Sequence, residues 1–154
     1  MIQRIQTVFL FLAIIALVLF NIFPYWQVAA REEGMQLQLM SYGIATTVQG
    51  VTTVDYGLYA LVAGLSGGAI IIALVEIFTY KNRLTQMKLA IANSFLMTAT
   101  LVLMTYFVVG LQEEYQGDFG LGIFVFALAM LLNILARRFI QKDEKLVRSV
   151  DRLR

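Results

Sequence analysis

The stretch IQTVFLFLAIIALVLFNIFPY at residues 5–25 decides the fold class of this chain. It is apolar almost throughout, and about 20 such residues are enough for a helix to cross the hydrocarbon core of a bilayer. Arg4 precedes it and Trp26 follows it, and an aromatic residue at the end of an apolar run is typical of the membrane interface. We therefore predict a first transmembrane span over residues 5–25.

Three further apolar stretches follow, and together they predict a mainly α, polytopic membrane protein built as a four-transmembrane-helix bundle. The expected spans cover residues 5–25, 57–80, 87–111 and 119–140, with a tail at residues 141–154. Because the spans consume more than half of the chain, we expect one integral membrane domain over residues 1–154. A cleaved signal peptide is the alternative for the first span, since small residues at Val28 and Ala30 follow its apolar core.

The positions of the basic residues predict the orientation. Of the 12 Lys and Arg residues, all except Arg31 lie before the first span, between the second and third, or after the fourth. Short loops rich in Lys and Arg stay on the cytoplasmic side of a membrane. We therefore expect both termini in the cytoplasm and the loops at residues 27–56 and 112–118 outside.

The first outer loop, residues 27–56, has the sequence pattern of β-strands. Met35, Leu37 and Leu39 alternate with Gln36, Gln38 and Met40, which is the two-residue period of a half-buried strand. Further on, two stretches rich in Thr and Val flank Gln49-Gly50, a pair that favours a tight turn. We predict a small extracytoplasmic β-hairpin or three-stranded sheet that packs on the helix ends, because an isolated hairpin is marginal in water.

Cysteine and histidine are both absent. This composition argues against disulfides, the usual zinc sites, His-ligated haem, Cys-ligated clusters and nucleophiles activated by His. We therefore expect no catalytic residue, no metal and no cofactor, although a lipid enzyme that uses Glu and Arg is a weaker alternative. Nucleic acid is not an expected partner, because the basic residues lie beside apolar spans, where anionic lipid headgroups are found.

Glu76 is the one ionisable side chain well inside a predicted span, and such a carboxylate is a functional-site hypothesis by default. At 1.5 Å per residue, Glu76, Asn93 and Asn133 lie roughly 6–9 Å inside their spans. We expect them at similar depth, with Arg137 and Arg138 as counter-ions. Three interpretations stay open: a contact that fixes helix register, a proton or cation site open to the cytoplasm, or a contact with a partner.

Small residues recur along one face of the second span. Ala60, Gly64 and Gly68 follow each other at four-residue spacing, with Gly67 beside them. Such residues let helix backbones approach closely, which favours packing within the bundle, with another copy of the chain as the alternative. The tail at residues 141–154 has the pattern of a basic amphipathic helix that lies on anionic lipid or docks on a cytoplasmic partner.

Both ends of the chain, MIQRIQT at residues 1–7 and KDEKLVRSVDRLR at residues 142–154, together with the layout of the spans, resemble an uncharacterised family. It is a set of small four-span membrane proteins of Bacteroidetes, known as a domain of unknown function. The resemblance implies a bacterial inner-membrane location and carries no known catalytic or binding residue. The order of spans and loops is also similar to claudin-like proteins, but the paired loop cysteines of that family are missing, so the analogy is architectural.

From these observations we expect a non-enzymatic integral membrane protein that acts as an accessory, scaffold or assembly subunit of an inner-membrane complex. The expected partners are the lipid bilayer and a protein or a second copy, bound through the Gly64/Gly68 face, the outer loop or the basic tail. The alternative is a small transporter or channel component that uses Glu76 as a proton or cation site.

Overall fold

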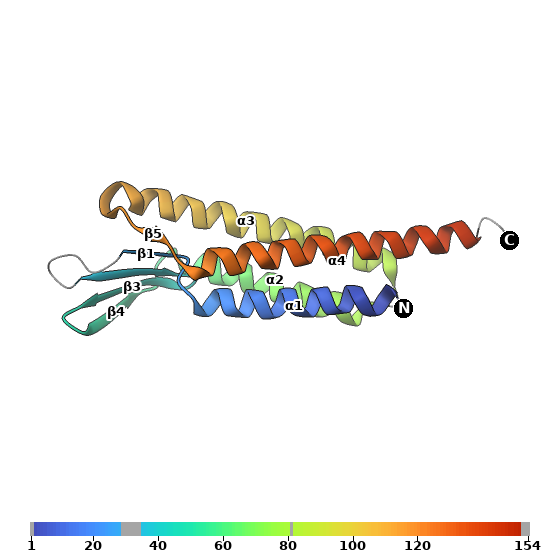
Figure 1. Cartoon of the computed structure of the whole chain (residues 1–154), viewed down its shortest axis with the longest axis horizontal. Coiled ribbons are helices and arrows are strands. Elements are labelled where there is room, and N and C mark those ends of the chain that lie inside the picture. The colour runs from blue at the N-terminus through green and yellow to red at the C-terminus, as the bar shows by residue number, and fades with distance from the viewer. Residues whose placement is uncertain (1, 29–34, 81, 152–154) are drawn as a thin grey trace.

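The computed structural model describes residues 2–28, 35–80 and 82–151, with side chains over 5–28, 35–80 and 82–145. Its helices are α1 (Ile2–Ile22), α2 (Ala60–Phe78), α3 (Arg83–Tyr115) and α4 (Leu121–Asp151). They lie side by side along the long axis of the molecule, with the β-strands at one end (Figure 1). We call this the sheet end. The opposite end, where α2 passes to α3, is the turn end, and there α1 begins and α4 ends.

On α2, α3 and α4, the buried residues that contact neighbouring helices recur at spacings of three or four. On α2 these are Val62, Ser66, Ala69, Ala73 and Glu76. On α3 they are Gln86, Ala90, Asn93, Met97, Thr100, Met104 and Val108. On α4 they include Phe126, Ala129, Asn133, Ala136 and Ile140. This spacing is that of nearly parallel or antiparallel helices that pack at about 20° with a left-handed twist.

The four predicted helical spans are confirmed as four helices long and apolar enough to cross a membrane. Their ends differ from the prediction. Helix α1 stops at Ile22 because Pro24 cannot donate a helical hydrogen bond. Helix α3 begins at Arg83, where the Asn82 side chain accepts a hydrogen bond from the Thr85 amide at 3.2 Å, and it continues to Tyr115. Helix α4 runs without a break into the tail as far as Asp151, so these tail residues are helical as predicted.

The sheet is larger than predicted. It contains β1 (Trp26–Val28), β2 (Gln36–Met40), β3 (Gly43–Val48), β4 (Val51–Asp55) and β5 (Asp118–Phe119). All pairings are antiparallel, in the order β4-β3-β2-β1-β5. The expectation of two or three strands from one loop missed β1 and β5, because three and two residues are too short to show an alternating pattern.

The predicted details of the central strands are confirmed. In β2, Leu37 and Leu39 are buried and the first residue, Gln36, is exposed, which is the expected alternation. Met35, which the predicted pattern also included, precedes the strand. Gln49 and Gly50 both have positive φ angles, 50° and 83°, in the tight turn between β3 and β4. Two consecutive positive φ angles match the twist of a two-residue hairpin.

The sheet is fixed to the helices by backbone hydrogen bonds, as the prediction of packing on helix ends requires. The Ala63 amide donates to the Ser41 carbonyl at 2.9 Å. At the start of α4, the Gly120 amide donates to Tyr25 and the Gly122 amide donates to Pro24, at 3.1 and 2.9 Å. The first amides of a helix have no partner within the helix, so these carbonyls complete the start of α4.

Candidate functional site

Glu76 lies in the packed interface of α2, close to the turn end. Its side chain is 0% exposed, and neither carboxylate oxygen has a hydrogen-bond partner among the described residues. A buried ion normally needs a partner, because its desolvation costs several kcal/mol. Glu76 is therefore a buried carboxylate whose desolvation is not offset by hydrogen bonds from the described residues.

Two glutamines from neighbouring helices lie in the same layer. Gln86 of α3 donates through Nε2 to the backbone carbonyl of Glu76 at 3.1 Å. Gln6 of α1 donates through Nε2 to Gln86 Oε1 at 3.5 Å. Both glutamines are buried, and Gln6 Oε1 has no donor among the described residues. We call Gln6, Glu76 and Gln86 the Glu76 layer, and it contains three unpaired acceptor oxygens, two of Glu76 and one of Gln6.

Asn93 and Asn133 form a separate layer. Asn93 Nδ2 donates to Asn133 Oδ1 at 3.3 Å, and Asn133 Nδ2 donates to Ser94 Oγ at 3.1 Å. We call these three residues the asparagine layer. A cavity of about 80 Å³ lies beside Ser94 and Asn133. The structure therefore brings the two predicted asparagines together but does not join them to Glu76.

The two layers are about 10 Å apart along the bundle, because Gln86 and Asn93 are seven residues apart on α3. Between the two layers, the core contains a buried alanine from each of three helices: Ala73 of α2, Ala90 of α3 and Ala136 of α4. The expectation of a similar depth for Glu76, Asn93 and Asn133 is therefore wrong. Its error lies in the start of α3, which was placed at Met87 instead of Arg83.

Arg137 and Arg138 do not serve as counter-ions to Glu76. An ion pair at this end joins Arg83 Nη2 to Asp143 Oδ2 at 3.2 Å. Helices α3 and α4 are antiparallel, and both the Asn93–Asn133 and the Arg83–Asp143 contacts fix the same register between them. Ile140, seven residues after Asn133, is therefore level with Gln86, seven residues before Asn93. Helix α4 therefore presents Ile140 to this level of the core, whereas Arg138 is exposed and Arg137 is half-buried.

The predicted small-residue face of α2 is mostly outside the bundle. Ala60 and Gly64 are exposed, and a Cβ added at Gly64 or Gly67 would meet no atom within 4 Å. At Gly68 it would lie 3.5 Å from Leu96 Cδ1, so Gly68 is the one of these three glycines that faces α3 closely. The expectation that the stripe packs within the bundle is wrong for Gly64 and Gly67, because α2 uses the neighbouring face that contains Ser66 and Ala69.

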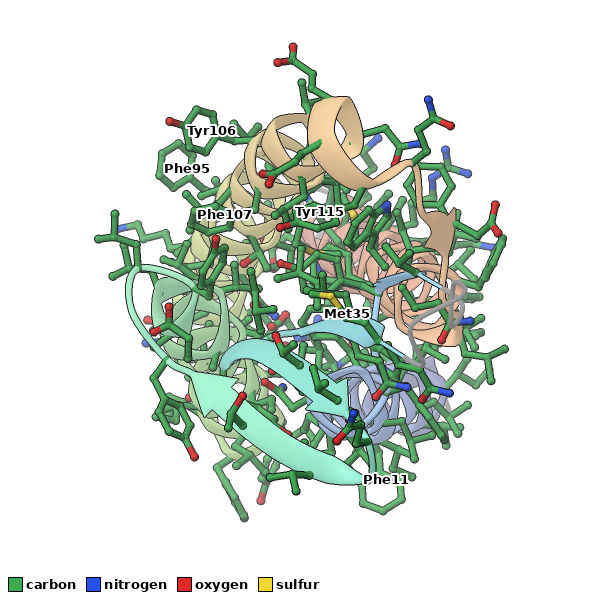
Figure 2. All side chains as sticks on the ribbon, turned by 90° about the vertical axis from the view of Figure 1, so that its left-hand side faces the viewer. Phe11, Met35, Phe95, Tyr106, Phe107 and Tyr115 are labelled. Atoms are coloured by element: carbon green, nitrogen blue, oxygen red, sulfur yellow. The ribbon has the colours of Figure 1, made fainter. Side chains whose placement is uncertain are left out.

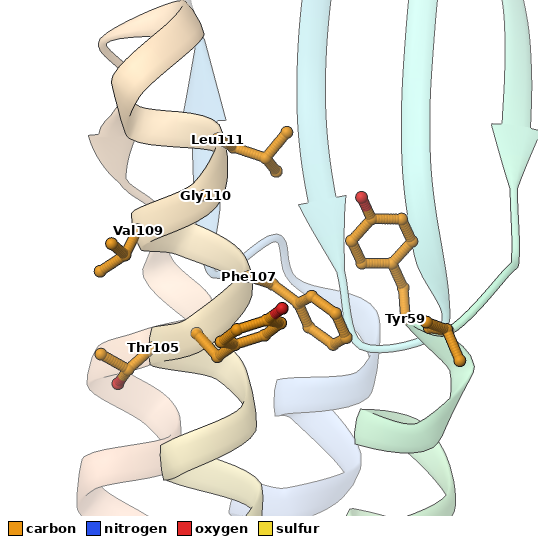
Figure 3. A pocket seen from close by; sticks show the side chains of 8 residues that line it. Tyr59, Thr105, Phe107, Val109, Gly110 and Leu111 are labelled. Atoms are coloured by element: carbon orange, nitrogen blue, oxygen red, sulfur yellow. The ribbon is translucent and has the colours of Figure 1, made fainter.

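A second concave feature lies at the sheet end between the start of α2 and the end of α3. It is an apolar groove of about 650 Å³, in which the Tyr59 and Phe107 rings are 4.7 Å apart (Figure 3). Burial, together with the nearby Asp55 charge, raises the pKa of the Tyr59 phenol. The sequence gives no sign of this groove, because its two walls are far apart in the chain.

The comparison with protein families covers almost the entire chain. A family model described as a domain of unknown function, DUF4293, matches residues 2–153. The chain belongs to this family. No curated protein matches the chain. Membership in DUF4293 confirms the predicted resemblance to a domain of unknown function, and the description of DUF4293 assigns no reaction, ligand or partner.

In this DUF4293 member, the residues that sequence reasoning missed are Gln86 and Ser94, while Gln6 was not included in the candidate site. Gln86 lies just outside the predicted span at residues 87–111, although it lies seven residues before Asn93 and fourteen before Thr100. That spacing returns a residue to the same side of a supercoiled helix. A search for polar residues at heptad spacing would have placed Gln86 in the core.

Proposed function

We propose that the protein is a multi-pass protein of the bacterial inner membrane in Bacteroidetes, with both termini cytoplasmic and the sheet outside. Four helices are long and apolar enough to span a bilayer. Large apolar side chains also cover their outward faces, including Phe11, Phe95 and Tyr106, which are 57%, 74% and 72% exposed and project away from the bundle (Figure 2). Apolar surface on this scale suits lipid better than water.

We further propose a non-enzymatic role as an accessory, scaffold or assembly subunit of an inner-membrane complex. The observation that carries this proposal is the open face of α2 at Gly64 and Gly67. In lipid, small residues promote helix association by close backbone contact, and here the chain itself does not use these two glycines. Their face is therefore available to a helix of a partner protein or of a second copy.

Substitution of Gly64 by Leu tests this role. Since Gly64 is exposed and a Cβ there would meet no atom within 4 Å, the fold should persist while close approach of another helix is blocked. We expect a partner, or a second differently tagged copy, to co-purify with the wild type in mild detergent and to be lost from G64L.

The matched control is Ala127→Leu, which adds a leucine on an exposed face of α4. This variant should retain the partner. Equal retention by G64L and A127L, or a wild type that holds neither a partner nor a second copy, would contradict an accessory role through the α2 face.

A second candidate function is that of a small transporter or channel component that uses Glu76 as a proton or cation site. The specific observation in its favour is a buried carboxylate without a hydrogen-bond donor. Further polar residues, Asn93 and Thr100, follow along the same buried face of α3. Conduction would require a rearrangement, because buried alanines and methionines separate these polar positions in the structure.

A further inference from the structure

The Glu76 layer has an imbalance between hydrogen-bond donors and acceptors. Gln86 uses its Nε2 on the Glu76 backbone and its Oε1 on Gln6, so its amide groups are engaged. What remains in the layer are acceptors: both carboxylate oxygens of Glu76 and Oε1 of Gln6. Buried polar groups are almost always paired, so three unpaired acceptors indicate that a positively charged or donating species belongs there.

The charged side chains of the neighbouring helices do not supply it. The described side chains of α1, residues 5–22, are all uncharged. On α3, Arg83 pairs with Asp143 of α4 and Lys88 is exposed. On α4, Arg138, Lys142 and Lys145 are exposed, and Arg137 makes no hydrogen bond to the carboxylate. Within the described side chains, the Glu76 carboxylate therefore has no protein cation.

We propose that the Glu76 layer is a binding site for a proton, held on the Glu76 carboxyl group. A metal cation such as Mg²⁺ or Ca²⁺ takes about six or more oxygen ligands, whereas the layer offers three. Among the described residues, no group of three or more His, Cys, Asp or Glu side chains could hold a metal ion. A proton needs only one carboxylate oxygen. Its binding removes the buried charge of Glu76 and leaves a neutral acid that can donate a hydrogen bond.

The proton exchanges with solvent at the turn end of the bundle. Glu76 lies two residues before the end of α2 and Gln86 three residues after the start of α3. These offsets correspond to about 3 and 5 Å along the helices. On the other side, Ala73, Ala90 and Ala136 close the core before the asparagine layer. With the proposed orientation, the turn end faces the cytoplasm.

This inference deepens the second candidate function by naming its ligand, but proton binding does not itself require transport. Infrared spectroscopy of the full chain in lipid vesicles separates the two. We expect the wild type to show the carbonyl band of a protonated carboxylic acid at neutral pH and to lose it at alkaline pH. Glu76→Gln should lack the band, and Glu113→Gln, at an exposed position near the sheet end, should keep it.

Isotope-labelled glutamate in the wild type should shift the same band, which identifies it as a glutamic acid even if E76Q fails to fold. Absence of a glutamic acid band at neutral pH would overturn the proposal. Its disappearance on addition of Na⁺ or K⁺ at constant pH would also overturn it, because the occupant would then be a metal cation. A band that is present without proton flux across the vesicles retains the proton site and contradicts the transport role.

Discussion

Trp26→Ala is expected to lower the free energy of unfolding by about 3–5 kcal/mol, the usual cost of truncating a large buried aromatic side chain. Trp26 is 1% exposed and is paired in the sheet with Leu39 on one side and Phe119 on the other. Its indole Nε1 also donates to Gln112 Oε1 at 2.8 Å, which ties the sheet to the end of α3. Truncation therefore removes a core contact and a link between distant segments.

The measurement for Trp26 is thermal unfolding of the full chain in one detergent. Tyr106→Ala is the matched control, because this aromatic side chain lies on the exposed face of α3. Exposed substitutions usually change stability by about 0.5 kcal/mol or less. A W26A protein as stable as Y106A would show that the sheet end is not packed as described.

Gly122→Ala is expected to destabilise the protein by about 1–3 kcal/mol, the range for overpacking a filled core. A Cβ at this position would lie 2.6 Å from the Phe23 carbonyl oxygen and 2.9 Å from the Pro24 carbonyl carbon. Both neighbours are backbone atoms, so α4 must move away from the chain that leaves α1. That movement would also weaken the hydrogen bond from the Gly122 amide to Pro24.

Gly64→Ala is the control, because it is expected to raise the stability of the protein instead of lowering it. Its Cβ would meet open space, and alanine within a helix is about 0.5–1 kcal/mol more favourable than glycine. The same unfolding measurement should therefore rank G64A at or above the wild type and G122A below it. A reversed order would contradict the packing of α4 against the residues that follow α1.

The features that the sequence predicts correctly depend on local patterns. The four helices follow from long apolar stretches, and the β3–β4 turn follows from Gln49-Gly50, which accepts positive φ angles. Strands β1 and β5 could not be predicted, because their pairing is created by the close approach of two chain segments that are distant in sequence. Likewise, α3 extends to Arg83 because of a cap at Asn82, and the apolar pattern alone does not contain that information.

The sequence identifies several polar residues of the candidate site, but it does not predict which of them contact each other. Glu76 stands out in any apolar helix, but its neighbours depend on which faces of α1 and α3 meet α2. A difference of four residues in the start of α3 moved Asn93 away from Glu76 by roughly one helical turn. The expectation that Arg137 is a counter-ion of Glu76 is wrong because of the register between α3 and α4, which places Ile140 level with Gln86.

We propose that the bundle crosses a membrane with the sheet outside and the Glu76 layer near the cytoplasmic face. Since the chain has no cysteine, single cysteines can report it directly. Val51 is 67% exposed at the tip of the sheet, and Lys145 is exposed near the end of α4. On spheroplasts, a membrane-impermeant thiol reagent should label Val51→Cys at once and Lys145→Cys only after the membrane is disrupted. Labelling of Lys145→Cys but not Val51→Cys on intact spheroplasts would contradict the account.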